Sequence, residues 1–509
     1  MPPKIRTVPT ASGATAIQII WGYRNRQPIL DHIGSAHTPE ELALLTTQAQ
    51  RIIDGEQLSL DLCLNADITM PAGTGAHDNP IPITSERAGL LINAIRGAYQ
   101  HLKLDNATNH DQVFFNLVAA RVIFPGSKLE SIETLAEVGI ASASYRTIQR
   151  HLPTYETLEF RDRITHALAT HAAIGPGVMV LYDVTTLYFE TDKADDLRKP
   201  GFSKERRLEP QITAGLLSDA SGFPLAIGAF EGNKAETHTM ILMITRLKEA
   251  YQLDDITVVA DAGMFSAGNK KAVVEAGLHY ILGTKEREIP APIAAWRAAH
   301  PGAAYTDGQI WSVTRPLQSG GERGSEAVTY YQYSWDRARR SLRGIEEQIA
   351  KAERAVAGLV PVKRYRYVDL KAAQKQVNHA LADKHRALAG VKGYETSRSD
   401  LAAGEVIGAY RQLFKIEKAF RMAKSDLKAR PIFHRKKDSI DAHLTIMMAS
   451  MAVGHVLEQR SGLSLKRLVR ILKRYRTFTV EVAGHRVFAQ APVPDDVALI
   501  VDRLPKPSD

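Results

Sequence analysis

Two aspartates stand in strongly apolar runs of this chain of 509 residues. Asp183 interrupts the run GVMVLYDVTTLYFE, and Asp261 ends the run ITVVAD. Runs of this kind are typical of buried strands, and open α/β sheets bind ligands at the carboxyl ends of their strands. Because hard cations prefer oxygen ligands, the two carboxylates could share a divalent metal ion. Taken singly, each aspartate could instead cap a turn or the start of a helix.

A third carboxylate, Glu417, lies in a segment typical of a helix, residues 405–425. Tyr410, Glu417 and Lys424 recur every seven residues, which places them along one stripe of an α-helix. Apolar side chains flank this stripe, namely Leu413, Phe414 and Phe420. We therefore expect Glu417 to face the protein, where a metal or phosphate site would explain a carboxylate that is otherwise costly to bury. The alternative is an amphipathic helix from which Glu417 and Lys424 reach solvent at one edge.

Three carboxylates, two from strands and one from a helix, suit phosphoryl transfer with two metal ions. One ion activates the attacking oxygen, the other stabilises the leaving oxygen, and the developing charge is neutralised electrostatically. We predict that Asp183, Asp261 and Glu417 are catalytic and bind two Mg²⁺ or Mn²⁺ ions. Lys424 would contact a phosphate near the scissile bond.

The elements that would position these side chains alternate between strands and helices in the middle of the chain. Three strands, a helix, a strand, a helix and a strand follow one another, which favours an α/β layered domain with a mixed sheet. The expected strands are 177–184, the two strands of a hairpin in RLEPQITAGLLSD and FPLAIGAFEG, 255–261 and 279–285, and the expected helices are 236–252 and 266–276.

The alternation breaks between residues 287 and 404, where we expect an inserted subdomain. Helices at 405–425 and 440–458 would return the chain to the layered domain. The insertion would hold strands near 304–316 and 326–335, a charged helix in SWDRARRSLRGIEEQIAKAERAVAG and a strand in VKRYRYVDL.

The first part of the chain combines a hairpin with helices. Residues 15–30 are typical of two strands around a polar turn, and residues 38–53 of an amphipathic helix capped by Thr38. Residues 127–152 have the spacing of a helix-turn-helix, with a turn after Gly139. Its second helix would carry three candidate DNA contacts on its outer face, Arg146, Gln149 and Arg150. An ordinary helical hairpin would show the same spacing.

The charge of the chain favours a polyanionic partner such as nucleic acid, since the net charge is +9 and the pI about 9.3. Between Arg411 and Lys437 ten basic residues stand against two acidic ones. Within this stretch Arg421 and His434 are candidate phosphate contacts, and Tyr410 would either contact DNA or pack its helix. The segment LSLKRLVRILKRYRTF carries six basic residues, which would face DNA or simply form a solvated surface.

Other features narrow the class of protein. A single cysteine, Cys63, excludes an intramolecular disulfide and a cysteine-rich zinc site. We find no apolar signal-peptide region at the N-terminus and no run of about 18 apolar residues that would span a membrane. We therefore expect a cytoplasmic protein.

With these residues in place, the sequence resembles the DDE transposases of bacterial insertion sequences, most of all the superfamily with the Tyr-Arg-Glu-Lys signature. The segment YRQLFKIEKAFRMAK supplies Tyr410, Glu417 and Lys424, but Leu413 stands where the signature has Arg. Four further stretches support the resemblance, namely HIGSAHTPEEL, FPGSKLESIETL, GFSKERRLEPQITAGLLSDASGFPLAIGAFEGN and VVADAGMFSAGNKKAVVEAGLHYILGTK. VKGYETSRSDL resembles the family's exit from its insertion, although Lys392 replaces an expected acid.

The resemblance implies a ribonuclease-H-like catalytic core and metal-dependent cleavage at the ends of a transposon. Water would attack first, and the freed 3′-hydroxyl would then attack target DNA. It also implies that the N-terminal region binds the terminal inverted repeats, that the protein acts as a homodimer on DNA, and that it is associated with the bacterial nucleoid. The insertion matches in place, since 156 residues separate Asp261 from Glu417 and 78 separate Asp183 from Asp261.

We therefore predict an α/β protein with an interrupted ribonuclease-H-like core and a mainly helical N-terminal DNA-binding region. A non-catalytic DNA-binding descendant of a transposase, or a metal-dependent nuclease without strand transfer, are the alternatives. The expected regions are a hairpin and helical region (1–100), a helix-turn-helix-like region (101–170), the catalytic core (171–286 and 405–458), the insertion (287–404) and a basic C-terminal region (459–509).

Overall fold

The computed structural model divides into two compact units, Met1–Pro80 and Ile81–Asp509, and each is described by itself. The residues that the structure describes are 3–10, 14–24, 27–36, 38–54, 83–175, 177–188, 210–231, 236–251, 253, 255–261, 267–316, 326–360, 365–369, 376–428, 436–482 and 485–508. His434 lies outside these residues.

The first unit is a three-stranded antiparallel sheet, in the order β1-β2-β3, with one helix packed against it. Its elements are β1 (Lys4–Pro9), β2 (Thr15–Arg24), β3 (Gln27–Ala36) and α1 (Pro39–Asp54). The expected hairpin is confirmed by the pairing of β2 with β3. Thr38 caps α1 as expected, since its Oγ1 accepts a hydrogen bond from the amide of Glu41 at 3.2 Å.

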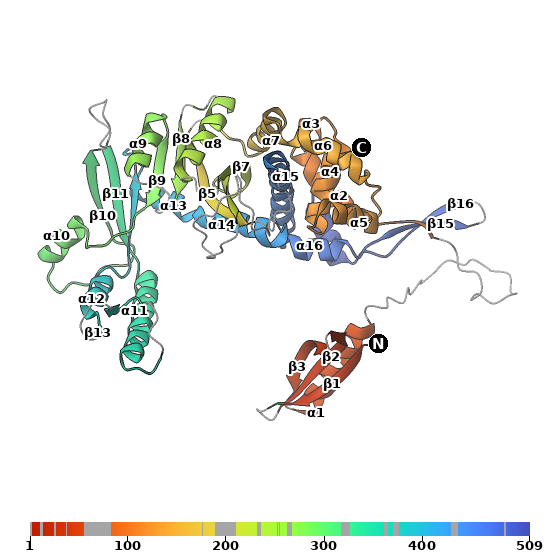
Figure 1. Cartoon of the computed structure of the whole chain (residues 1–509), viewed down its shortest axis with the longest axis horizontal. Coiled ribbons are helices and arrows are strands. Elements are labelled where there is room, and N and C mark those ends of the chain that lie inside the picture. The colour runs from red at the N-terminus through yellow and green to blue at the C-terminus, as the bar shows by residue number, and fades with distance from the viewer. Residues whose placement is uncertain are drawn as a thin grey trace. The chain divides into compact units, whose positions relative to one another are not determined.

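The second unit is built on a mixed sheet of eight strands, in the order β10-β11-β14-β9-β8-β5-β6-β7 (Figure 1). β5, β8 and β9 are parallel, and every other neighbouring pair is antiparallel, so the predicted mixed sheet is confirmed. The strands are β5 (Val178–Tyr188), β6 (Gln211–Ser218), β7 (Pro224–Glu231), β8 (Ile256–Ala260), β9 (His279–Gly283), β10 (Ile310–Pro316), β11 (Glu326–Tyr333) and β14 (Val391–Thr396).

Helices cover both faces of this sheet. Side chains alternate between the faces of a strand, and on β14 Glu395 binds Lys270 of α9 (Ala267–Glu275), whereas Lys392 binds Tyr410 of α13 (Ala403–Arg411). α9 and α13 therefore lie on opposite faces. α8 (Glu236–Tyr251) packs on β6 and β7, and α14 (Leu413–Arg421) packs on β5.

The region expected to be an insertion contributes strands to the main sheet. β14 pairs with β9, β11 with β14, and β10 with β11, so the sheet continues past the parallel strands. The expected strand in VKRYRYVDL is short, since among its described residues only Val368–Asp369 (β12) are extended and paired. The remaining elements here are α10 (Ala291–Ala299), α11 (Trp335–Val356), β13 (Gln376–Val377) and α12 (His379–Ala387).

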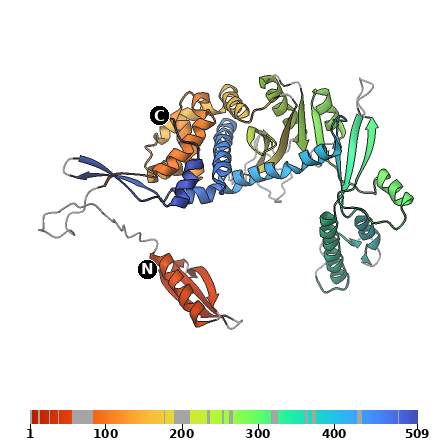
Figure 2. The same cartoon turned by 180° about the vertical axis from the view of Figure 1, so that it is seen from behind.

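A long buried helix, α15 (Lys437–Ser461), joins the sheet to a helical region, and Figures 1 and 2 both show it between the two. Within the described ranges α15 is the one helix long and apolar enough to cross a membrane, but 94% of its apolar window is buried inside the protein. The surrounding helices are α2 (Gly89–His101), α3 (Leu104–Ala107), α4 (Gln112–Ile123), α5 (Lys128–Glu137), α6 (Tyr145–Glu156), α7 (Leu158–His171), α16 (Leu465–Leu472) and α17 (Asp495–Arg503).

The two helices of the expected helix-turn-helix are present as α5 and α6. Gly139, with φ of +80°, lies in the turn, and a side chain there would collide with the backbone of Glu86. Ser144 caps α6 by accepting a hydrogen bond from the amide of Thr147 at 3.2 Å. Beside them β4 (Ile83–Arg87), β15 (Thr477–Val482) and β16 (His485–Gln490) form a small antiparallel sheet.

Candidate active site

The two aspartates stand at one level of the parallel strands. Leu181 of β5 pairs with Val259 of β8, and Val259 pairs with Ile281 of β9. Two residues further along the three strands come Asp183, Asp261 and Gly283. Residues in register on parallel strands point to the same face, so the carboxylates share the face that α13 and α14 cover. This register brings two residues 78 apart in the sequence into neighbouring positions.

Asp183 is held by the chain around it. Tyr182 and Val184 on either side are buried, whereas Asp183 itself is half-buried. Its Oδ1 accepts a hydrogen bond of 2.8 Å from the amide of Val184. The local strand thus fixes one carboxylate oxygen and leaves the side chain at the covered face of the sheet.

Asp261 is exposed and is held from outside its strand. The hydroxyl of Tyr410 on α13 donates a hydrogen bond of 2.9 Å to its Oδ1. The ring of Tyr410 packs edge-on against Tyr394 of β14, with 5.2 Å between ring centroids. Burial, and then the charge of Asp261, raises the pKa of Tyr410 well above its ordinary value, so the hydroxyl remains a donor.

Lys392 of β14 completes this group. Its Nζ donates a hydrogen bond of 3.2 Å to the hydroxyl of Tyr410 and lies 4.4 Å from the centroid of that ring. Burial lowers the pKa of Lys392, while the negative charges of Asp261 and Glu417 oppose that shift. The sequence singled out Lys392 only as a departure from a family pattern, because its contact with Tyr410 depends on the pairing of β14 with β9.

Glu417 lies on α14, the helix that packs on β5, and its charge raises the pKa of both Lys392 and Tyr410. The expectation that Tyr410, Glu417 and Lys424 share an inward-facing stripe is wrong. Tyr410 is 8% exposed, but Glu417 is exposed, and the flanking Phe414 is 60% exposed. The cause is a break in the expected helix at Gln412, where the carbonyl accepts from the amide of Lys415. A turn of this kind, between Tyr410 and Glu417, changes the phase of the helix.

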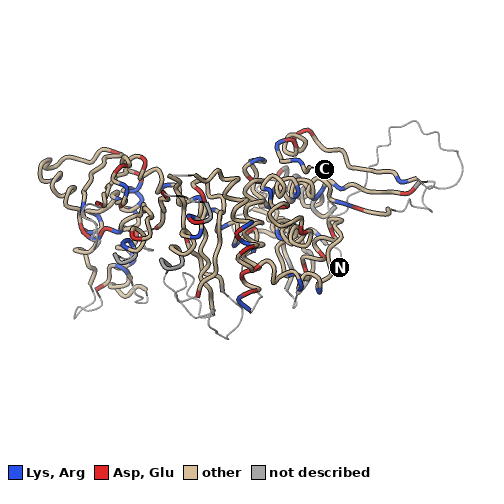
Figure 3. Tube along the Cα trace, turned by 90° about the horizontal axis from the view of Figure 1, so that it is seen from above, with Lys and Arg blue, Asp and Glu red and all other residues tan. Residues whose placement is uncertain are grey.

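The other candidate contacts differ in exposure. Lys424 is half-buried and lies in a π-helical turn, Met422–Asp426, at the end of α14. Arg421 is exposed, and so are the three candidates on α6, which are Arg146, Gln149 and Arg150. Tyr410 has little ring surface left for stacking on DNA, because its ring is buried between the sheet and α13. Figure 3 shows basic and acidic residues interspersed over the described chain, so charge alone does not mark a DNA-binding face.

The carboxylate oxygens at this site are ligands of the type that a hard divalent cation prefers. Asp183 and Asp261 offer carboxylate oxygens from neighbouring strands, and Mg²⁺ and Mn²⁺ prefer such ligands. Among the residues that the structure describes, no group of three or more His, Cys, Asp or Glu side chains is arranged to hold a metal ion. The register of the strands brings the two aspartates together, and the charge of Glu417 acts on Lys392 and Tyr410 beside them.

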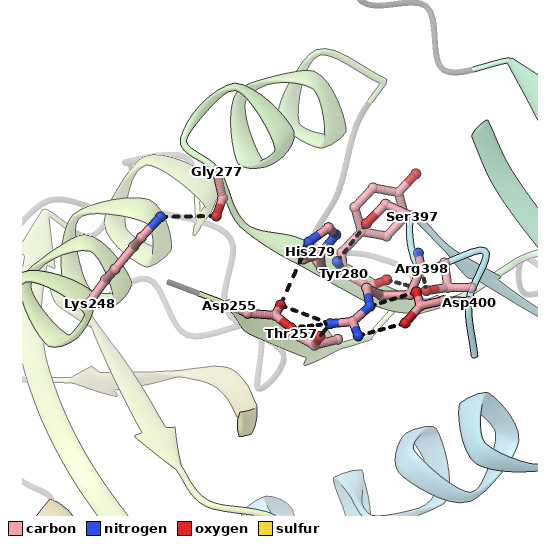
Figure 4. A network of polar contacts seen from close by, with 10 residues as sticks. Lys248, Asp255, Thr257, Gly277, His279, Tyr280, Ser397, Arg398 and Asp400 are labelled. Atoms are coloured by element: carbon pink, nitrogen blue, oxygen red, sulfur yellow. Dashed lines mark hydrogen bonds and ion pairs between the residues drawn. The ribbon is translucent and has the colours of Figure 1, made fainter. Parts of the chain in front are cut away.

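A second group of polar side chains connects the strands at the opposite edge, where β8 and β9 begin and β14 ends (Figure 4). Arg398, which follows β14, donates hydrogen bonds of 2.8 Å to both oxygens of Asp255, at the start of β8. It also binds both oxygens of Asp400, at 2.8 and 2.7 Å. The hydroxyl of Ser397 accepts from the amide of Tyr280 at 3.0 Å. We call the contacts of Arg398 with Asp255 and Asp400 the clasp around Arg398. The sequence did not predict it, since nothing in SRSD indicates a partner 143 residues earlier.

Comparisons with known proteins bear on the same region. A family model described as the transposase DDE domain matches residues 175–452, which contain Asp183, Asp261 and Glu417. No curated protein matches the chain. Among solved structures, the chain is similar to the piggyBac transposase in a cryo-EM structure of its synaptic complex with hairpin DNA. That similarity has a TM-score of 0.35 and 11% identity, and it covers 76% of this chain and 69% of the other.

Proposed function

The chain belongs to the transposase DDE domain family, whose model matches more than half of its residues, and we propose that it cuts and joins DNA with Asp183, Asp261 and Glu417. The observation that carries this proposal is the register of β5 and β8, which brings Asp183 and Asp261 to one level and one face of the sheet. The family accounts for the reaction class, namely cleavage and transfer of DNA strands.

The proposed catalytic core is ribonuclease-H-like and comprises β5 to β9 with α8, α9, α13, α14 and α15. Three antiparallel strands, β7, β6 and β5, are followed by the parallel strands β8 and β9, which supports this assignment. Residues 287–404 would be the insertion into that core. Its strands β10 and β11 lie outside β14 at the edge of the sheet.

In this proposal Asp183 and Asp261 hold the divalent cations, and Glu417 contributes the third carboxylate. When bound, two such ions would activate the attacking oxygen and stabilise the leaving oxygen of a phosphodiester. Because Glu417 is exposed on α14, it is open to an approaching DNA strand as well as to a cation. Lys424 and Arg421, on the same stretch of helix, would bind backbone phosphates of the DNA being cut.

We also propose that α6 contacts the terminal inverted repeats of the element and that the protein acts as a homodimer on DNA. The exposure of Arg146, Gln149 and Arg150 supports a role of α6 as a recognition helix. The second candidate function is that of a DNA-binding descendant of a transposase that has lost catalysis. It is consistent with the absence of a three-carboxylate cluster among the described residues.

Cleavage of a labelled duplex that carries the element's own ends separates these functions. The wild-type protein with Mg²⁺ should cut at the ends and yield joined products, and a chelator should abolish both. Glu417→Gln should bind the duplex but not cut it, whereas Glu347→Gln, an exposed glutamate on α11, should cut normally. Equal cleavage by Glu417→Gln contradicts the site assignment. Tight binding without cleavage by the wild type would favour the non-catalytic protein, and cleavage without joining would favour a nuclease.

A further inference from the structure

Three side chains from three elements form a continuous chain of contacts that ends on a candidate metal ligand. Lys392 Nζ donates to the Tyr410 hydroxyl at 3.2 Å, and that hydroxyl donates to Asp261 Oδ1 at 2.9 Å. Lys392 also lies over the ring of Tyr410, 4.4 Å from its centroid, in a cation–π contact. Both hydrogen bonds therefore run the same way, from Lys392 to Tyr410 and from Tyr410 to Asp261.

Gly283 has no side chain, and this leaves the space that the Tyr410 hydroxyl occupies. In register it lies beside Asp261 on one side and beside Tyr394 of β14 on the other. A Cβ at this position would collide with the Tyr410 hydroxyl and would lie 2.7 Å from the Cζ of that ring. The ring of Tyr394, on the strand next to Gly283, packs against the ring of Tyr410. Tyr410 thus reaches Asp261 only because the strand between Asp261 and Tyr394 has no side chain at that level.

We propose that Tyr410 is a positioning residue that holds the Asp261 carboxylate for metal binding, and that Lys392 acts on the carboxylate through Tyr410. The proposal rests on the proposed function, in which Asp261 is a metal ligand. Carboxylates that bind metals are commonly oriented by a hydrogen bond from a neighbouring group, and losing that partner typically costs about 10- to 100-fold in metal affinity or activity. Asp261 is exposed and follows the last residue of β8, and Tyr410 holds its carboxylate from a different element.

Lys392 allows a sharp distinction between two roles. If it acted only through its positive charge, it would repel a cation bound at Asp261, and its removal would tighten metal binding. If it acts by holding Tyr410, its removal loosens the hydroxyl and weakens metal binding. The two roles therefore predict changes of opposite sign.

Binding of Mn²⁺ to the full-length protein without DNA tests this inference, with free Mn²⁺ measured by electron paramagnetic resonance. Tyr410→Phe should weaken binding about 10- to 100-fold. Gly283→Ala, which keeps the hydroxyl but displaces it, should weaken binding in the same way. Lys392→Met should weaken binding less, and it should add nothing in a Tyr410→Phe background, as expected for residues that act in series.

Two controls keep the result interpretable. Tyr99→Phe removes a buried tyrosine hydroxyl outside the candidate site, where it bonds Thr108 at 3.0 Å, and it should leave Mn²⁺ binding unchanged. Lys392→Arg, which keeps a cationic donor, should retain most of the binding. Circular dichroism would establish that each variant is folded.

The outcomes that overturn the inference are distinct from those that overturn the site. If folded Tyr410→Phe binds Mn²⁺ as the wild type does, or if Lys392→Met binds it more tightly, the positioning role is wrong while Asp261 remains a ligand. A wild-type protein that binds no Mn²⁺, or Asp261→Asn that binds it as tightly as the wild type, removes the metal site and the positioning role together.

Discussion

Asp183 on β5 and Asp261, the residue after β8, each lie two residues beyond the paired residues Leu181 and Val259 of two parallel strands. Neighbouring strands lie about 4.8 Å apart, so this register brings the two carboxylates close together on one face of the sheet. A cation would relieve the repulsion between two such charges, and this makes metal binding testable through stability.

Mn²⁺ should therefore stabilise the protein against heat. At a concentration about 100-fold above its dissociation constant, a ligand that binds only the folded state stabilises it by about 2.7 kcal/mol. Differential scanning fluorimetry should show a rise in Tm with Mn²⁺ for the wild type and none for Asp183→Asn or Asp261→Asn. An equal rise in both variants would place the bound ion elsewhere.

The clasp around Arg398 should contribute to stability rather than to catalysis. Its side chain is 18% exposed and donates to two carboxylates, Asp255 and Asp400. Arg398→Ala should lower the free energy of unfolding by about 2 kcal/mol, a typical value for hydrogen bonds to charged groups. Urea unfolding measures this change. The matched control is Arg339→Ala, which breaks an ion pair whose partners are 72% and 74% exposed and should cost less than about 1 kcal/mol. Similar losses in both variants would contradict the role of the clasp.

A buried lysine gives the stability a dependence on pH. Lys128, at the start of α5, is 7% exposed, and burial, followed by the charge of Arg121, lowers its pKa from 10.5 to about 7. Between these two values the unfolded chain binds the proton and the folded protein does not, so the contribution of Lys128 to stability rises as pH rises from about 7 to 10.5. Below this window the full penalty for burying the charge applies.

Lys128→Met should therefore stabilise the protein most at pH 7 and below, by up to about 5 kcal/mol for a pKa lowered from 10.5 to about 7, and least near pH 10. Chemical unfolding across the window measures the difference between variant and wild type. Lys351→Met, at an exposed position of α11, should show no such trend. A difference that grows with rising pH would have the wrong sign and would reject the explanation.

The exposed face of α6 should determine affinity for the ends of the element. If Arg146 and Arg150 bind phosphates, each substitution by Ala should weaken binding and lower the salt dependence by about one unit of slope. Gln149→Ala should instead reduce the preference for the element's ends over scrambled DNA. Fluorescence anisotropy on both duplexes measures these effects, with Arg343→Ala on α11 as control. Unchanged binding by all three variants of α6 would make it a packing helix.

Local patterns predicted the parts of the fold that depend on local interactions. The apolar runs before Asp183 and Asp261 predicted β5 and β8, and the helices between the strands followed from their periodicity. The face of Glu417 could not be predicted, because one turn at Gln412 ends the periodicity on which the prediction depended. The contact of Tyr410 with Asp261 joins residues 149 apart, and no spacing along the chain encodes it.

The pairing of β14 with β9 also has a consequence for shorter versions of this chain. Without β14, β10 and β11, the strand β9 would form the edge of the sheet and expose its unpaired backbone groups. An open edge recruits strands from other molecules and promotes aggregation. A deletion of residues 287–404 would therefore not release a minimal soluble nuclease core. We expect such a deletion to self-associate, because β9 would lose the strand that covers its edge.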